Sequence, residues 1–161
     1  MKGIGVLQHF GRALMLPMIA LPAAAIFLCM AKLPWSYVGL DQFGPVLRVA
    51  GETIFSFLPV IFAVGVAFGL TGNAGMAGMS AMLAYFLINE ISRYAFGHSF
   101  RISIGGGILI GLVAAWSFQR FKSLEFPEYI QLFGGSRFVP LFMSAFSLVY
   151  AFLNVHVGPW I

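Results

Sequence analysis

Charge is scarce in this sequence. Charged residues make up 9% of its 161 residues, whereas roughly 25% is usual in soluble domains, and apolar residues reach 60%. A soluble domain of this length needs a mostly polar exterior, which so few polar residues cannot supply. The composition therefore excludes an ordinary soluble domain and predicts an integral membrane protein with an all-α fold.

Side chains that carry chemistry are equally few. The single cysteine, Cys29, excludes an internal disulfide and a cysteine-rich metal site. His9, His98 and His156 lie far apart, and none has a Cys, Asp or Glu at metal-ligand spacing. No nucleophile stands beside a base, so the sequence offers no catalytic residue, metal site or cofactor. The nine basic residues are scattered, which suits the ends of membrane loops better than a nucleic-acid surface.

One polar stretch, Gln119 to Pro140, interrupts the apolar sequence. It holds five of the fourteen charged residues of the chain, three of them basic and two acidic. It also holds two prolines and a Gly-Gly pair. Long uncharged runs stand on both sides of it. A segment of this composition between two such runs is typical of a water-exposed loop between membrane spans.

The uncharged runs predict about five transmembrane helices. A hydrocarbon core of about 30 Å needs about 20 helical residues. The TGNAG segment, Thr71 to Gly75, divides an uncharged run that is too long for one span, because Gly and Asn form turns. A short interfacial helix is predicted within Met1 to Arg12. The predicted spans are about 13–31, 52–70, 76–96, 102–119 and 138–158.

The first span has an alternative interpretation. Two basic residues precede an apolar run that ends near Ala23-Ala24-Ala25, as in a cleaved secretory signal peptide. Pro17 and Pro22 inside the run, and its continuation to Ala31, favour an uncleaved span instead. The prolines should kink this helix, and a neighbouring helix must then satisfy the freed carbonyl groups.

Pairs of glycines occur four residues apart in two of the predicted spans, as Gly65 with Gly69 and Gly107 with Gly111. This spacing predicts close helix approach. Chance spacing in a glycine-rich membrane chain is the alternative.

Two charges stand near the end of the third predicted span. Glu90 and Arg93 are three residues apart, so they could pair on one helix face. Ionisable residues inside a membrane indicate function. The alternative is a solvated pair at a helix end.

The end of the polar stretch is the candidate site. Its GGSR segment exposes backbone N–H groups beside a cation and just before a helix, which favours anion binding. The alternative is that the glycines only make the turn and the arginine anchors at lipid headgroups. The residues concerned are Gly134, Gly135, Ser136 and Arg137.

The same segment carries a family resemblance. LEFPEYIQLFGGSRFVPLF resembles the loop and following helix of the membrane (IIC) component of bacterial phosphotransferase-system sugar permeases, in the glucose / N-acetylglucosamine branch. Three further stretches resemble the first, second and fourth spans of that family: FGRALMLPMIALPAAAIFL (Phe10–Leu28), LPVIFAVGVAFGL with TGNAG (Leu58–Gly75) and GGILIGLVAAWSFQRF (Gly106–Phe121). The family pattern differs at Ser136, where lysine is common, and at Asn73, where aspartate is common. Both differences remove a charge that could dock partner domains.

The resemblance implies a multi-pass protein of the bacterial inner membrane with a cytoplasmic N-terminus. Basic residues alone divide five against four between the two sides, a weak signal. The implied partners are the IIB and IIA domains or subunits, a second copy in a homodimer, the lipid bilayer and a C-terminal IIC half. In the family that C-terminal half carries the sugar-contacting histidine and glycine-isoleucine-threonine-glutamate segments. Neither occurs in this sequence, so we expect the N-terminal, interface half, with unknown substrate-binding residues and no phosphoryl-accepting residue.

Two functions follow from the sequence. The first is the membrane part of a phosphoenolpyruvate-dependent sugar permease for glucose or N-acetylglucosamine, with GRAL and FGGxRFVP leaning towards N-acetylglucosamine. The alternative is a stand-alone membrane scaffold or an inactive truncated remnant without transport activity. A small channel has little support because no ring of polar residues marks a pore.

Overall fold

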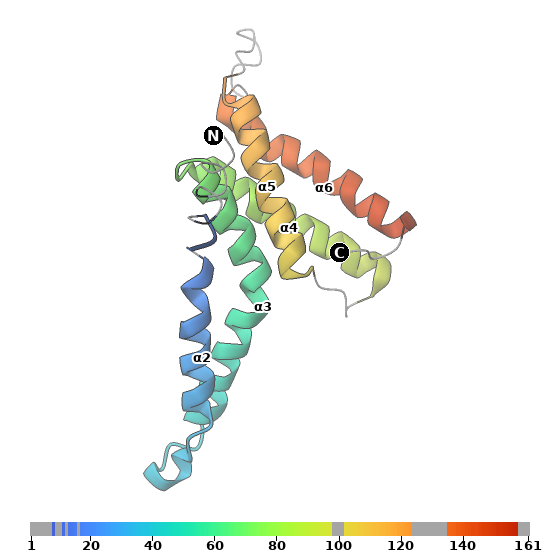
Figure 1. Ribbon diagram of the computed structural model, residues 1–161. Coiled ribbons are helices and arrows are strands. Elements are labelled where there is room, and N and C mark those ends of the chain that lie inside the picture. The colour runs from blue at the N-terminus through green and yellow to red at the C-terminus, as the bar shows by residue number, and fades with distance from the viewer. Residues whose placement is uncertain are drawn as a thin grey trace.

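The structure, a computed structural model, describes residues 8, 11, 13–15, 17–97, 102–123 and 135–157, without the side chains of residues 38, 96, 136 and 154–157. Every regular element among these residues is helical, as the composition predicts (Figure 1). The α-helices are α2 (Ala20–Ala31), α3 (Phe43–Leu70), α4 (Gly75–Phe96), α5 (Ile104–Phe121) and α6 (Phe138–Val157), and the 3-10 helices are η1 (Trp35–Val38) and η3 (Gly135–Arg137).

The prolines of the first apolar run sit where a helix tolerates them. α2 begins at Ala20, after a break at Ile19, so Pro22 lies in its first turn. N–H groups in a first turn have no partner within the helix, and the missing proline donor therefore costs nothing there. Pro17 precedes the break and is fully buried. Ile19 itself keeps right-handed helical backbone angles, at a φ of −67° and a ψ of −24°, so the predicted kink at the prolines stays a prediction.

The TGNAG segment forms the turn that the sequence predicts. α3 ends at Leu70 and α4 begins at Gly75, with Gly72 and Asn73 both at a φ of 66°. These left-handed conformations suit Gly and Asn and let the chain reverse within four residues. The Asn73 N–H donates to the carbonyl of Phe68 at 2.9 Å and closes the end of α3.

Helix α3 begins earlier than the predicted range of 52–70, at Phe43. The sequence between the first two apolar runs contains Pro45, Arg48 and Glu52. Pro45 falls in the first turn of α3, where proline is accepted. Arg48 and Glu52 form an i, i+4 pair at 2.7 Å, which helical spacing brings together. The polar residues therefore extend the helix by nine residues.

Both predicted glycine pairs lie at close helix contacts. Gly107 and Gly111 of α5 face the backbone of α3, where a Cβ added to either would overlap the carbonyl oxygen of Pro59 or Ala63. On another side of α3, Gly69 meets Ala13, and Gly65 meets the ring of the buried Pro17. The spacing therefore reflects packing of these helices and is not coincidental.

The core lies where α4, α5 and α6 pack against the C-terminal part of α3. Small residues of α4 face this core and allow its close pairing with α6, an antiparallel pair that leads away from α2 and the N-terminal part of α3 (Figure 1). The Ser147 hydroxyl of α6 donates to the Met143 carbonyl at 2.6 Å and lies 3.5 Å from the Ala84 carbonyl of α4. The α4–α6 pair and the α2–α3 pair diverge from one another along α3 (Figure 1).

Three segments of the described chain are long and apolar enough to cross a membrane: Ala13–Ala31, Phe43–Leu70 and Ile104–Phe121. Phe138–Leu153 is a shorter apolar helix. Long apolar helices and many exposed apolar side chains identify a membrane protein. The five-span arrangement as a whole stays a prediction.

Candidate functional site

The predicted loop contact lies only partly within the described residues. Gly134 and residues 124–133 fall outside them, as do His9 and His98 and the side chain of His156. Gly135, at a φ of 64°, begins η3, and the exposed Arg137 ends it. α6 starts at the next residue. The end of the polar stretch thus stands directly before a helix, as the predicted anion contact requires, and that contact stays a prediction.

The neighbouring helix ends share this face of the molecule. The Gln119 side-chain amide near the end of α5 donates to the carbonyl of Leu70, the last residue of α3, at 3.0 Å. That carbonyl belongs to the last turn of a helix and has no partner within it. The amide of Gln119 therefore fastens the end of α5 beside the α3–α4 turn, where Asn73 lies.

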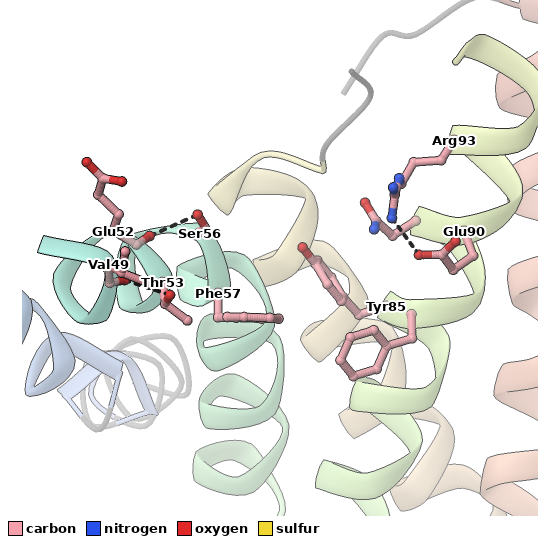
Figure 2. Close-up of a pocket in the computed structure, with 10 residues that line it drawn as sticks. Val49, Glu52, Thr53, Ser56, Phe57, Tyr85, Glu90 and Arg93 are labelled. Carbon is pink, nitrogen blue, oxygen red and sulfur yellow. Dashed lines mark hydrogen bonds and ion pairs between the residues drawn. The ribbon is translucent and has the colours of Figure 1, made fainter. Parts of the chain in front are cut away.

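A cleft of about 530 Å³ opens between the N-terminal part of α3 and the C-terminal part of α4 (Figure 2). It lies near the opposite ends of these helices from the TGNAG turn. Its polar and aromatic lining comes from two helix faces with helical spacing: Val49, Glu52, Thr53, Ser56 and Phe57 on α3, and Tyr85, Phe86, Asn89, Glu90 and Arg93 on α4. We call this space the α3–α4 cleft.

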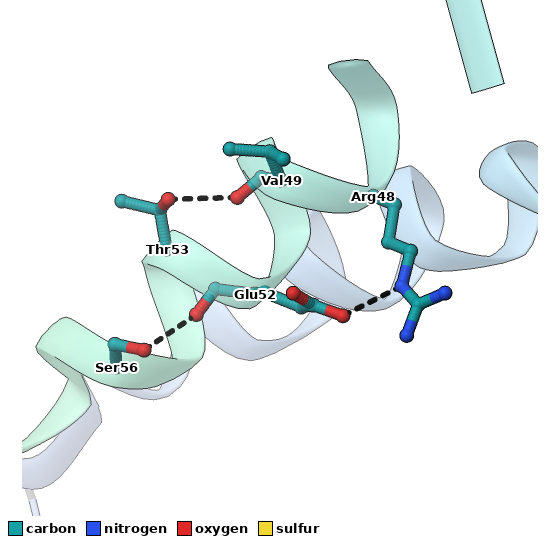
Figure 3. A network of polar contacts seen from close by, with 5 residues as sticks. All are labelled: Arg48, Val49, Glu52, Thr53 and Ser56. Carbon is teal, nitrogen blue, oxygen red and sulfur yellow. Dashed lines mark hydrogen bonds and ion pairs between the residues drawn. The ribbon is translucent and has the colours of Figure 1, made fainter. Parts of the chain in front are cut away.

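The α3 side of the cleft has its own polar network (Figure 3). The Thr53 hydroxyl donates to the Val49 carbonyl at 2.7 Å, and the Ser56 hydroxyl donates to the Glu52 carbonyl at 2.9 Å. Arg48 Nε donates to Glu52 Oε1 at 2.7 Å. The two hydroxyl groups use their protons within the helix, so their oxygens present acceptors toward the cleft.

The α4 side contains the charge pair predicted from the sequence. Arg93 Nη1 donates to Glu90 Oε1 at 2.9 Å, and the side chains are 36% and 65% exposed respectively. The predicted i, i+3 pair is confirmed. Exposure of this degree leaves both groups with hydrogen-bonding capacity beyond the pair itself.

Asn89 is the cleft residue that sequence reasoning missed. Its Oδ1 atom is buried and has no hydrogen-bond partner among the described residues. Buried polar atoms normally have a partner, but this oxygen has under 1 Å² of accessible surface and therefore does not face the cleft. The sequence signal was available: Asn89 lies one residue before Glu90 and four before Arg93, on the same face of a helix that is otherwise apolar.

Two carboxylates and one guanidinium group line the cleft, those of Glu52, Glu90 and Arg93. Glu52 and Glu90 each pair with an arginine of the same helix, at 2.7 and 2.9 Å. The cleft therefore has several hydrogen-bond donors and acceptors, and the arginine that pairs with Glu52, Arg48, lies outside its lining. No three His, Cys, Asp or Glu side chains gather as a metal site within the part of the chain that the structure describes.

Comparison with known proteins assigns a family. The family model "Phosphotransferase system, EIIC" matches residues 11–161. The chain is also 37% identical, over 99% of its length, to the "PTS system glucosamine-specific EIICBA component" of Bacillus subtilis (strain 168). It spans 26%, about a quarter, of that relative's length.

Proposed function

Because the chain belongs to the phosphotransferase system EIIC family, we propose that it forms the N-terminal part of the membrane domain of a phosphoenolpyruvate-dependent sugar permease. The observation that carries the proposal is the family match over residues 11–161 together with the 37% identity along the whole chain. The apolar helices supply the membrane-embedded part that such a permease needs.

In the proposed arrangement α3, α4, α5 and α6, together with the segment Ala13–Ala31 that includes α2, cross the inner membrane, giving five spans. The N-terminus is then cytoplasmic, and so are the TGNAG turn and the segment from Gln119 to Pro140. The α3–α4 cleft opens on the outer side. This orientation places the candidate contact Gly134–Arg137 where phosphorylated partner domains would dock.

The partners follow from the same family. The relative carries EIIC, EIIB and EIIA in one named component, so we propose that this chain works with IIB and IIA domains of its own system. The remaining part of an IIC domain would complete the sugar site, and the exposed apolar side chains of the segment Ala13–Ala31, such as Met15, Met18 and Ile26, would pack against lipid or a second copy. The proposed substrate class is glucose and its 2-amino derivatives, which include N-acetylglucosamine and glucosamine.

Uptake measurements test the proposal. The chain is expressed with all coding sequence that continues its reading frame, in bacteria that lack their own glucose-type permeases but keep the general phosphotransferase proteins. We expect phosphoenolpyruvate-dependent accumulation of phosphorylated labelled glucose, N-acetylglucosamine or glucosamine. Membrane insertion without phosphorylated product from any of the three would contradict the proposal and favour the scaffold function.

The proposed topology has a separate test. A reporter that is active only in the cytoplasm is fused after Lys122 in the α5–α6 connection, and the matched fusion is made after Gly97 in the α4–α5 connection. We expect activity for the first fusion and none for the second. The reverse pattern would invert the proposed orientation.

A further inference from the structure

We propose that the hairpin of α2 and the N-terminal part of α3 is a hinged arm that opens and closes the α3–α4 cleft. The arm comprises residues 20–58, and its hinge lies at the height of Pro22 and Pro59. The arm projects away from α4 and α6 (Figure 1). The inference concerns a movement within this chain, and it is independent of the substrate and of the membrane orientation proposed above.

Glycine contacts fix how the two helices of the arm are aligned. The chain runs in opposite directions along α2 and α3 (Figure 1). A Cβ on Gly65 would meet the ring of Pro17, and one on Gly51 would meet the side chain of Leu28. The residues between Pro17 and Leu28 therefore lie beside the residues between Gly51 and Gly65.

Prolines stand at nearly the same height in both helices. Pro22 and Pro59 are respectively five and six residues from the first of these two contacts, so at 1.5 Å per residue their heights differ by about 1.5 Å. Pro59 lies inside α3, where its missing N–H leaves the Phe55 carbonyl without its helical partner. The ladder of α2 begins only at Ala20, two residues before Pro22. An unbroken ladder of backbone hydrogen bonds therefore crosses this height in neither helix.

The two turns of α3 before the proline are weakened as well (Figure 3). The Thr53 hydroxyl donates to the Val49 carbonyl at 2.7 Å, and the Ser56 hydroxyl donates to the Glu52 carbonyl at 2.9 Å. Hydroxyl groups that bond in this way compete with the helical N–H groups and bend helices, and proline does the same in the next turn. Residues 49–59 therefore form a segment at which α3 bends easily.

The part of α3 after the hinge is held in place. A Cβ on Gly107 or Gly111 of α5 would overlap the carbonyl oxygen of Pro59 or Ala63, so the two backbones touch there. α2 packs against α3, and within the described ranges of the chain it makes no contact of similar extent with α4, α5 or α6. The arm is therefore joined to the other helices mainly through α3.

The α3–α4 cleft gives the arm room to move. Its volume is about 530 Å³, and its α3 wall belongs to residues 49–57, within the arm. Glu52 lies seven residues before Pro59, and Phe43 lies 16 residues before it. A rotation of about 10° at the hinge displaces Glu52 by about 2 Å and Phe43 by about 4 Å. The width of the cleft therefore depends on the angle of the arm.

Distances between spin labels on the full chain in phospholipid vesicles test the movement. In a Cys29→Ser background, labels on Val46→Cys and Tyr94→Cys report the separation of the arm from α4, and both native side chains are exposed. Two control pairs each share one of these labels, Ala23→Cys with Val46→Cys inside the arm and Tyr94→Cys with Leu148→Cys on α4 and α6. We expect the distance distribution between the arm and α4 to be at least about twofold wider than that of either control. Equal widths for the three pairs would overturn the inference.

Restoring the missing hydrogen bond should stiffen the hinge. Pro59→Ala returns an N–H donor to the Phe55 carbonyl, and we expect the Val46–Tyr94 distribution to narrow to the width of the control pairs. Pro45→Ala is the matched control, because the first turn of α3 needs no such donor, and it should leave the distribution unchanged. An unchanged width in Pro59→Ala, with unchanged control pairs, would refute the hinge.

A second variant decides the question if Pro59→Ala disturbs the fold, which a changed Tyr94–Leu148 distance would reveal. Thr53→Val combined with Ser56→Ala removes both hydroxyl bonds and leaves the proline in place. It should narrow the distance distribution between the arm and α4 and leave both control pairs unchanged. A width equal to that of the parent protein would count against the hinge.

Discussion

The contact between α5 and α3 gives the sharpest stability prediction. A Cβ added to Gly107 would lie 2.9 Å from the carbonyl carbon of Pro59 and closer still to its oxygen. Ordinary contact begins at about 3.4 Å, and the obstacle is backbone of a packed helix that cannot rotate away. Gly107→Ala must therefore push the two helices apart or displace the Pro59 carbonyl group.

Gly105→Ala is the matched control in the same helix. Its added Cβ would meet only the Ser103 hydroxyl oxygen, at 3.6 Å, which is ordinary contact. Both substitutions gain about 1 kcal/mol because alanine is the better helix former. Only Gly107→Ala pays for overpacking, which costs about 1–3 kcal/mol. The difference between the two variants should therefore be about 1–3 kcal/mol in the free energy of unfolding.

Thermal unfolding of the purified protein in detergent measures this difference. At about 2–4 °C per kcal/mol for a chain of this size, Gly107→Ala should unfold about 2–12 °C below Gly105→Ala. Gly111→Ala should behave like Gly107→Ala because its Cβ would overlap the Ala63 carbonyl. Equal unfolding temperatures for the Gly105 and Gly107 variants would refute the close approach of α5 to α3.

Three further variants test other contacts by the same measurement. Gln119→Ala removes the donor to the Leu70 carbonyl and should cost about 0.5–1.5 kcal/mol; no loss would mean that water replaces the amide. Gly72→Ala forces a side chain into a φ of 66° and should cost about 1 kcal/mol in the free energy of unfolding. Gly75→Ala lies at the start of α4 with open space around it and should be neutral or stabilising. Equal unfolding free energies for the two variants would contradict the turn geometry. Ser147→Ala should cost under about 1 kcal/mol because the hydroxyl bonds mainly to its own helix; a larger loss would mean that the contact with the Ala84 carbonyl matters more than its 3.5 Å length suggests.

The apolar runs and the turn residues predicted most of the helical pattern. TGNAG combines residues that accept left-handed backbone, so the α3–α4 reversal could be located to within a residue or two. The start of α3 could not be located in this way. Hydropathy marks the part of a helix that lipid surrounds, and the polar first turns of α3, from Phe43 to Glu52, are stabilised by Pro45 in the first turn and by the Arg48–Glu52 pair. An apolar composition shows which residues contact lipid. The length of a helix also depends on side-chain pairs within it, such as Arg48 with Glu52.

Glycine spacing identified the close contacts but not the partner surfaces. Nothing in a four-residue repeat says that Gly65 and Gly69 meet Pro17 and Ala13, whereas Gly107 and Gly111 meet α3 itself. The α3–α4 cleft escaped sequence reasoning for a related reason. Its two faces are 28 or more residues apart in the chain, from Phe57 to Tyr85, and only the divergence of α3 from α4 makes them line one space. The Glu90–Arg93 pair was predictable because its members are local.

Packing along α3 explains why the cleft is where it is. From Pro59 to Gly69 the helix is held on two sides, by the α5 glycines and by the Pro17 and Ala13 contacts, so backbone lies close to backbone. Before Pro59, α3 packs against α2, where Gly51 meets Leu28. Along α3 the side chains change from Val60, Ala63 and Ala67 in the core to Glu52, Thr53 and Ser56 in the lining of the cleft. The switch from small apolar to polar residues on one helix face therefore marks the place where the packed core gives way to the cleft.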